Sequence, residues 1–154
     1  MKKIIPICIL AMTIIASCGK LPENGDLDGM WQLMEMSEKA SEGEHEYINP
    51  INKKDEAIYW SFQLKMMMIH SPKTQHNGRT YYTSGRFIHT GKTLDVTEMY
   101  VHFFDRDSLI DDANTTLLEP VGVHGNKTTY RIEQLNDHRM ILQSDYNRLV
   151  FRKF

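Results

Sequence analysis

The stretch "YWSFQLKMMMIH", residues 59–70, carries the clearest secondary-structure signal in the chain. Apolar side chains recur at every second position along it, and alternate side chains of an extended strand point to the same side of the sheet. The stretch is also rich in aromatic residues, which strands favour. We therefore predict one β-strand with one buried face. The residues expected to point inward are Trp60, Phe62, Leu64, Met66 and Met68.

The same period of two extends through the remainder of the chain after residue 27. Turn-forming pairs separate several of these segments, as expected for antiparallel neighbours. Residues 106–113 are the one helical candidate, and the polar residues 37–54 are expected to form a long loop. The further strand candidates are "RTYYTSGRFIH" (79–89), "TLDVTEMYVHFF" (93–104), "KTTYRIEQLN" (127–136), "HRMILQSD" (138–145) and "RLVFRKF" (148–154).

This spacing of strands predicts an all-β domain, and the local connections favour an antiparallel up-and-down β-barrel of about eight strands. A barrel of that size either is filled by side chains or encloses one small ligand. In the open case the stripe defined above would line the cavity, and its methionines would adapt to an apolar guest. In the filled case the same side chains would form a packed core. The sequence is compatible with both interpretations.

The N-terminal residues have the layout of an export signal. Two lysines precede the apolar residues 4–16, which are fewer than the roughly 20 needed to span a bilayer. The ending "IASC", residues 15–18, resembles the lipobox of bacterial lipoproteins. That resemblance implies cleavage before Cys18, diacylglycerol on its thiol and an acylated new N-terminus. The next residue is Gly19 rather than Asp, which by resemblance to enterobacterial lipoproteins implies the outer membrane, at its periplasmic or exterior face.

The chain therefore divides into three parts. We expect a lipoprotein signal peptide at residues 1–17, a lipid-anchored tether at 18–27 and one barrel domain at 28–154. Several acyl chains would hold the protein on a membrane without spanning it. The formal net charge is −2, and loss of the two leader lysines makes the mature chain more acidic. This balance argues against nucleic acid as a partner.

The start of the domain, "LDGMWQL", places Gly29 two residues before Trp31. This spacing resembles the Gly-x-Trp signature of lipocalins and bacterial lipocalin-like domains, and the chain is similar to small lipocalin-like lipoproteins of Bacteroidota. The resemblance implies that Trp31 plugs one end of the barrel and that an arginine of the last strand packs across it. Arg152 is the expected partner and Arg148 the second choice, and either would gain a cation–π attraction of roughly 0.5 to 2 kcal/mol.

No motif in the sequence points to catalysis. A Gly-x-Ser-x-Gly nucleophile motif is absent, and the one cysteine of the mature chain is assigned to lipid. The seven histidines include no His-x-x-x-His pair, although His89 and His102 could face each other from neighbouring strands. We therefore predict no catalytic residues, no metal site, no cofactor and no enzymatic activity.

Two functions are compatible with these observations. The first is a non-catalytic lipoprotein of the cell envelope that binds a small apolar ligand inside its barrel. The second is a filled-barrel scaffold or interaction module with an envelope protein as its partner. The fold alone does not choose between them, because function resides in the site.

Overall fold

The computed structural model describes residues 23–41, 46–73, 75–76, 79–103, 106–113 and 115–154. Cys18 and the expected signal peptide lie outside these residues. Among the described residues, no helix is long and apolar enough to cross a membrane. The strands are β1 (Gly29–Lys39), β2 (Tyr47–Asn52), β3 (Tyr59–Gln63), β4 (Met66–His70), β5 (Gln75–His76), β6 (Arg79–Thr80), β7 (Tyr82–His89), β8 (Thr93–His102), β9 (Asp107–Leu109), β10 (Thr128–Leu135), β11 (Arg139–Gln143) and β12 (Asn147–Lys153).

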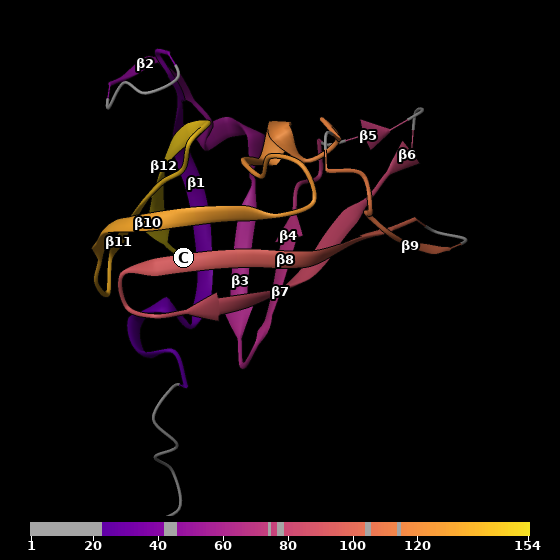
Figure 1. The fold of residues 1–154 in the computed structure, drawn as a ribbon, viewed down its shortest axis with the longest axis horizontal. Helices are drawn as coiled ribbons and strands as arrows, with labels where there is room; N and C mark the ends of the chain where they lie inside the picture. The colour runs from indigo at the N-terminus through magenta and orange to yellow at the C-terminus, as the bar shows by residue number, and fades with distance from the viewer. Residues whose placement is uncertain (1–22, 42–45, 74, 77–78, 104–105, 114) are drawn as a thin grey trace, which may run out of the picture.

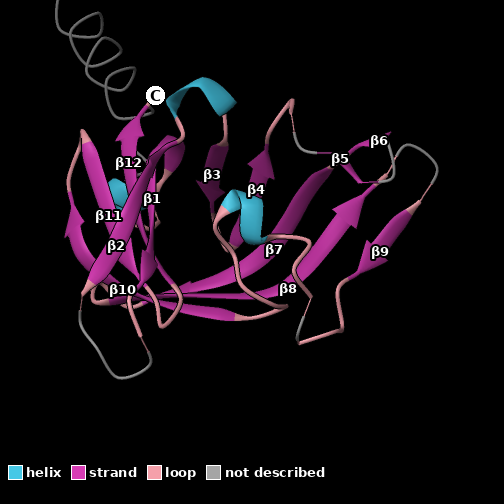
Figure 2. Ribbon diagram, turned by 90° about the horizontal axis from the view of Figure 1, so that it is seen from above, coloured by secondary structure: helices cyan, strands magenta, loops and turns pink. Residues whose placement is uncertain are grey.

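The expected all-β, up-and-down barrel is confirmed. Strands β1, β3, β4, β7, β8, β10, β11 and β12 pair antiparallel in chain order, and β12 returns to β1 to close the ring. Figure 1 shows the strands surrounding one interior, and Figure 2 shows the ring from above. Strands β2 and β9 lie outside the ring, where β2 pairs with β1 and β9 pairs with β8. The ring has no open edge between β8 and β10, because those two strands are hydrogen bonded.

The stretch at residues 59–70 is a hairpin rather than one strand, so the expected stripe is only partly correct. Strand β3 ends at Gln63, a turn occupies residues 64–65, and β4 begins at Met66. Gln63 pairs with Met66 and Phe62 with Met67. Inward positions therefore have even numbers on β3 and odd numbers on β4.

Burial follows this change of parity. Trp60 and Phe62 face the interior as expected, and Met67 and Ile69 continue the inward face on β4. Leu64, Met66 and Met68 do not line the interior, because their side chains are 60%, 45% and 47% exposed. The assignment of these three residues to a ligand cavity was wrong, since a two-residue turn reverses which face each later residue occupies.

Two other segments differ from the sequence-based expectation. The helical candidate at residues 106–113 contains the short strand β9, whose three residues pair with β8. The expected loop at 37–54 instead contains the end of β1 and all of β2, which pair with each other. Pairing with the preceding strand supplied the hydrogen bonds in both cases and overrode the weak local pattern. The 3₁₀ turn η1 (Gly25–Leu27) precedes β1, and Leu27 belongs to the core although the domain was expected to begin at residue 28.

Neighbouring methionines test the hairpin directly. Met67→Ala should lower the free energy of unfolding by about 2 to 5 kcal/mol, because it removes a fully buried side chain and leaves a void. Met66→Ala and Met68→Ala should change it by less than about 0.5 kcal/mol, because both side chains already contact water. Urea unfolding of the three variants gives the measurement. A larger loss for Met66→Ala than for Met67→Ala would show that the register is wrong.

Candidate functional site

The interior of the barrel is occupied by a cluster of aromatic rings around Trp60. The ring centroid of Trp60 lies 5.1 Å from that of Phe151, 5.8 Å from Tyr130 and 6.2 Å from Phe62. Phe62 in turn meets Phe87 edge to face at 5.2 Å. All five side chains are at most 4% exposed. These rings come from β3, β7, β10 and β12, so they fill the space between opposite walls of the barrel.

One mouth of the barrel is closed by the segment that contains the 3₁₀ turn η3 (Glu119–Val121). The indole Nε1 of Trp60 donates a hydrogen bond to the Val121 carbonyl at 3.0 Å. The Gly122 carbonyl accepts from the Tyr130 hydroxyl at 2.7 Å and from Nδ2 of Asn147 at 2.9 Å. Burial raises the pKa of Tyr130 far above its ordinary value, so this hydroxyl stays a neutral donor. Figure 2 shows a helical turn inside the ring of strands in the view from above.

Gly122 is required where this segment meets the core. Its φ is +99°, and a Cβ atom there would lie 2.9 Å from Leu149 and 3.5 Å from Trp60. The adjacent side chains of Leu118, Val121 and Val123 are buried. The mouth is therefore sealed by backbone and apolar side chains rather than covered by a loose loop.

Trp31, for which the resemblance to lipocalins implied a plug, packs against the turn η1 that precedes β1. Trp31 is fully buried, and its Nε1 donates to the Leu27 carbonyl of η1 at 2.8 Å. The cation over its ring is Lys153, whose Nζ lies 4.3 Å from the ring centroid. Arg152 instead points outward and donates to the Gln32 side chain at 2.8 Å. Assigning Arg152, or alternatively Arg148, to this contact was wrong.

The alternation of side chains along β12 explains why Lys153, and not Arg152, lies over the Trp31 ring. Leu149 and Phe151 face the core, so Lys153 shares their side of β12 while Arg152 does not. Lys153 also lies directly opposite Trp31 in the ladder between β1 and β12. Gly29 fits the same contact, because a Cβ atom at that position would approach the Lys153 side chain at 3.3 Å and its φ is +111°.

Lysine and arginine variants of β12 distinguish the two assignments. Lys153→Ala should destabilise the fold by about 1 to 3 kcal/mol, because it removes the ring contact and the hydrogen bonds from Nζ to the carbonyls of Asp26 and Asp28. Arg152→Ala should cost less than about 1 kcal/mol, because it removes one partly exposed hydrogen bond. Thermal unfolding of both variants gives the comparison, and the reverse order would restore the arginine assignment.

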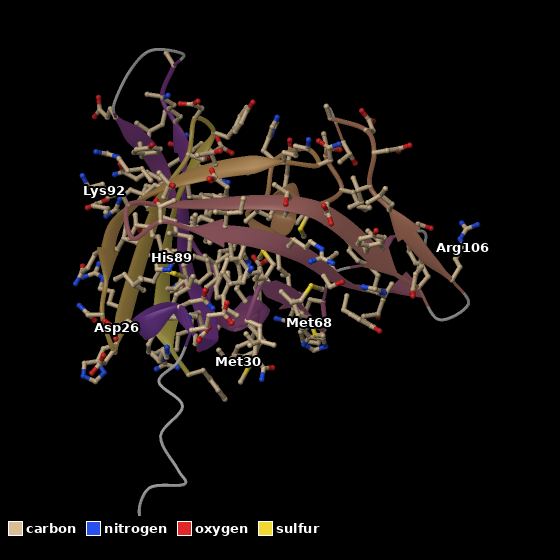
Figure 3. The ribbon with its side chains drawn as sticks, turned by 60° about the horizontal axis from the view of Figure 1, so that its bottom comes forward. Asp26, Met30, Met68, His89, Lys92 and Arg106 are labelled. Atoms are coloured by element: carbon tan, nitrogen blue, oxygen red, sulfur yellow. The ribbon has the colours of Figure 1, made fainter. Side chains whose placement is uncertain are left out.

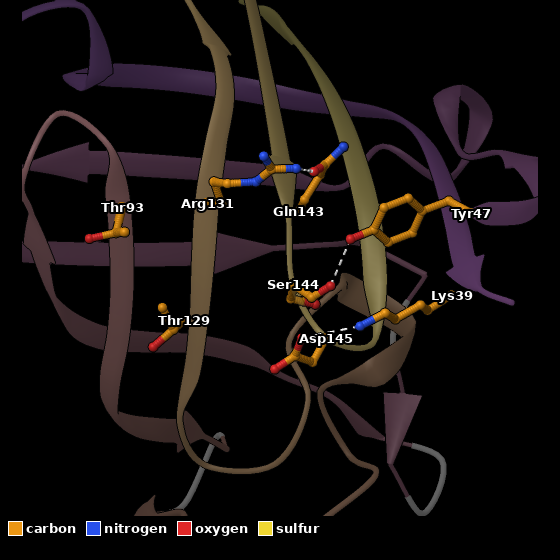
Figure 4. Close-up of a pocket in the computed structure, with 8 residues that line it drawn as sticks. All are labelled: Lys39, Tyr47, Thr93, Thr129, Arg131, Gln143, Ser144 and Asp145. Atoms are coloured by element: carbon orange, nitrogen blue, oxygen red, sulfur yellow. Dashed lines mark hydrogen bonds and ion pairs between the residues drawn. The ribbon is translucent and has the colours of Figure 1, made fainter. Parts of the chain in front are cut away.

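A pocket of about 500 Å³ lies on the outside of the barrel, where the β1–β2 hairpin stands beside the outer surface of β8, β10 and β11 (Figure 4). We call it the hairpin pocket. Each residue that lines it carries a polar group, and the residues come from strands that are distant in sequence. The residues that line it are Lys39, Tyr47, Thr93, Thr129, Arg131, Gln143, Ser144 and Asp145.

Hydrogen bonds hold the wall and the hairpin together. The Tyr47 hydroxyl donates to the Ser144 carbonyl at 2.9 Å, and Lys39 Nζ lies 3.2 Å from the Asp145 carboxylate. Burial is the main reason that the pKa of Tyr47 is raised above its ordinary value, so the phenol remains a donor at neutral pH. On the barrel wall, the Arg131 guanidinium donates through one Nη atom to the Gln143 side chain.

A carboxylate on β10 continues this network away from the pocket. Gln143 donates to Glu133 at 2.7 Å, and Arg148 donates to Glu133 through Nε at 2.9 Å. The hydrogen bond from Arg148 is the main cause that lowers the pKa of Glu133. The amide of Gln143 is thereby fixed between a cation and an anion, which sets the direction of its oxygen toward Arg131.

A second polar cluster has the order of a hydrolytic triad. Ser84 Oγ lies 2.7 Å from His102 Nε2, and His102 Nδ1 lies 2.8 Å from Asp107 Oδ1. Serine hydrolysis also needs backbone N–H donors aimed at the substrate oxygen. Strand β7 pairs with β8 with a register shift between Ser84 and Arg86, and His102 of β8 joins Ser84 of β7 to Asp107 of β9. We therefore interpret this cluster as a link that holds β9 against β8.

The histidines give no metal-binding arrangement in the described residues. His89 lies opposite Leu94 and His102 opposite Tyr82, at the two ends of the β7–β8 pair. The two histidines therefore do not face each other, an arrangement that the sequence had left open. Among the described residues, no group of three or more His, Cys, Asp or Glu side chains is placed to hold a metal ion.

Sequence reasoning missed the hairpin pocket altogether. Thr93, Thr129, Arg131 and Gln143 occupy outward strand positions, which a period-of-two pattern reads as solvated. The second wall comes from residues that were assigned to a loop. The one local signal is Tyr47, a large aromatic residue in an otherwise polar segment.

A closed up-and-down barrel of eight strands, with Gly-x-Trp on its first strand and a basic side chain of its last strand over that tryptophan, defines the lipocalin-like class. Comparison with known families gives the same class. The model of the lipocalin-like domain family matches residues 11–154, and the chain belongs to this family. No curated protein matches the chain.

Two solved structures share the fold. A lipocalin-like protein from Bacteroides uniformis is 18% identical, with a TM-score of 0.58 over 84% of this chain and 100% of that chain. An uncharacterized protein from Bacteroides eggerthii is 17% identical, with a TM-score of 0.51 over 83% of this chain and 99% of that chain. At these identities the comparison establishes the fold, and the function has to be inferred from the site.

Proposed function

We propose that this protein is a lipid-anchored, non-catalytic binding protein of the outer membrane. Its barrel is a filled scaffold, and its small-molecule site is the hairpin pocket. The lipobox-like ending at residues 15–18 supports the anchor at Cys18, and Gly19 supports the outer membrane. The Oγ of Ser144, the serine of the pocket, donates to Asn147 Oδ1 and accepts from the Tyr146 and Asn147 amides, which supports a structural role for this hydroxyl.

The observation that carries this proposal is the contrast between the barrel interior and the hairpin pocket. The described interior is packed around Trp60, so a guest there would have to displace buried aromatic rings. The hairpin pocket is already present and has a volume within the usual 300 to 1,000 Å³ of small-molecule sites. The apolar-ligand hypothesis depended on a lining stripe of which three members face outward, so we assign the ligand to the hairpin pocket instead.

The lining indicates the chemistry of the ligand. Lys39 and Arg131 contribute two cations against the single carboxylate of Asp145, which favours an anionic group. The hydroxyls of Thr93 and Thr129 suit a ligand that carries hydroxyl groups. The ring of Tyr47 offers an apolar surface for a carbon skeleton. A small hydroxylated carboxylate, such as a sugar acid, matches these features together.

Glucuronate and glucose form a matched pair of probes, because they differ in one carboxylate. Glucuronate should shift the backbone amide signals of the pocket residues in a saturable manner, and glucose should bind more weakly. Arg131→Gln should weaken glucuronate binding about tenfold or more, because it removes a charge-assisted hydrogen bond. Arg139→Gln, on the exposed surface of β11 outside the pocket, is the control and should leave the affinity unchanged.

Two results would contradict the assignment of the site. One is saturable binding whose affinity is the same for the parent chain and for Arg131→Gln. The other is the absence of any shift at the pocket residues with either probe. Labelling with an acyl precursor, compared between the parent chain and Cys18→Ser, tests the anchor separately.

A further inference from the structure

Five exposed apolar side chains gather on the outer surface where the described chain begins. Met30 lies opposite Ser61 across the β1–β3 ladder, and Ser61 lies opposite Met68 across the β3–β4 ladder. Ser61 thus lies between the two methionines, and Figure 3 shows both of them on the same lower face. We call this surface the tether face. Its exposed apolar residues are Met30, Leu64, Met66, Met68 and Phe154.

Leu64 is the most unusual member of the tether face. It occupies the tip of the β3–β4 hairpin with a φ of +56°, a region that leucine rarely adopts and that glycine or asparagine tolerates better. Its side chain is 60% exposed and contributes nothing to the core. Neither local conformation nor burial accounts for a leucine here, so its apolar surface points to a contact outside the chain.

The position of the tether face relates it to the N-terminal residues. Nδ2 of Asn24 donates to the Leu64 carbonyl at 2.7 Å, so the start of the described chain is fixed beside the hairpin tip. Glu23 follows Cys18 by five residues, and five residues reach at most about 18 Å when fully extended. An acyl group on Cys18 would therefore hold Glu23 within that distance of the bilayer interface, and Asn24 links the hairpin tip to this point.

We propose that the tether face rests on the phospholipid bilayer, with Leu64 and Met66 in the boundary between headgroups and acyl chains. This inference rests on the lipid anchor of the proposed function and adds an orientation to it. Exposed Lys65 at the same tip would keep its ammonium group at the phosphates while Leu64 enters the apolar boundary. The side chains of Met66 and Met68 adapt readily to a fluid surface.

This orientation directs the hairpin pocket away from the membrane. Strand β1 begins at Gly29 next to the tether face and ends at Lys39, which lines the pocket. The two sites therefore lie toward opposite ends of the same 11-residue strand, as the separation of β2 from the hairpin tip shows in Figure 1. A protein held in this way presents its pocket to the aqueous phase.

Tryptophan reporters test the contact in the full acylated chain. Leu64→Trp is compared with Leu109→Trp, which places the reporter at a similarly exposed apolar position on β9, three strands from β4. The parent chain supplies the background, because Trp31 and Trp60 are fully buried. Each protein is reconstituted into phosphatidylcholine vesicles whose acyl chains are either unmodified or brominated next to the headgroup. Bromine quenches tryptophan fluorescence only at close range.

We expect brominated vesicles to reduce the added emission of Leu64→Trp by about half or more and to leave that of Leu109→Trp unchanged. Met66→Trp repeats the measurement if the first variant does not fold. Equal quenching of the reporters on the tip and on β9, or no quenching of either, would overturn the orientation. Vesicle flotation separates the two proposals: a chain that floats without quenching rejects only the orientation, whereas a chain that does not float rejects the anchor and the orientation with it.

Discussion

The hydrogen bond from the Trp60 indole to the Val121 carbonyl is the interaction on which the architecture depends. Trp60 belongs to a hairpin in the barrel wall, whereas Val121 belongs to a connection 61 residues further along the chain. The bond fixes the indole across the interior and ties the connection over the mouth. The rings of Phe62, Tyr130 and Phe151 can then pack against a side chain of defined orientation. A buried indole without an acceptor would be costly, so the ring and the closing segment stabilise each other.

Because the interior is filled, the inside and the outside of the barrel have different roles. The packed core holds the strands in place, and their outward positions carry the hairpin pocket and the tether face. Arg131 on β10 lies between Thr93 on β8 and Gln143 on β11, so the ladders themselves bring the polar groups of the pocket together. The tether face arises in the same way from β1, β3 and β4. Both surfaces therefore have fixed geometry although neither is part of the core.

Strand content and barrel closure were predictable from the sequence because they depend on local alternation, which most strands of this chain display. The reversal at residues 64–65 was not predictable, because Leu64 and Lys65 are not turn residues and the apolar pattern runs through them without interruption. The Lys153 contact was accessible to parity reasoning from Leu149 and Phe151. The hairpin pocket was not, because it exists only once the β1–β2 hairpin stands against the barrel wall.

Titration with a fluorescent fatty acid, followed by energy transfer from Trp60 and Trp31, tests most directly whether the barrel is filled. Both indoles are buried inside the ring, so a guest in the interior would receive their emission. A filled barrel predicts no saturable transfer and no change in the thermal midpoint at any probe concentration below its micelle threshold. Saturable binding of one fatty acid per chain, with efficient transfer and a raised midpoint, would show that the barrel opens to an apolar guest and would contradict this account.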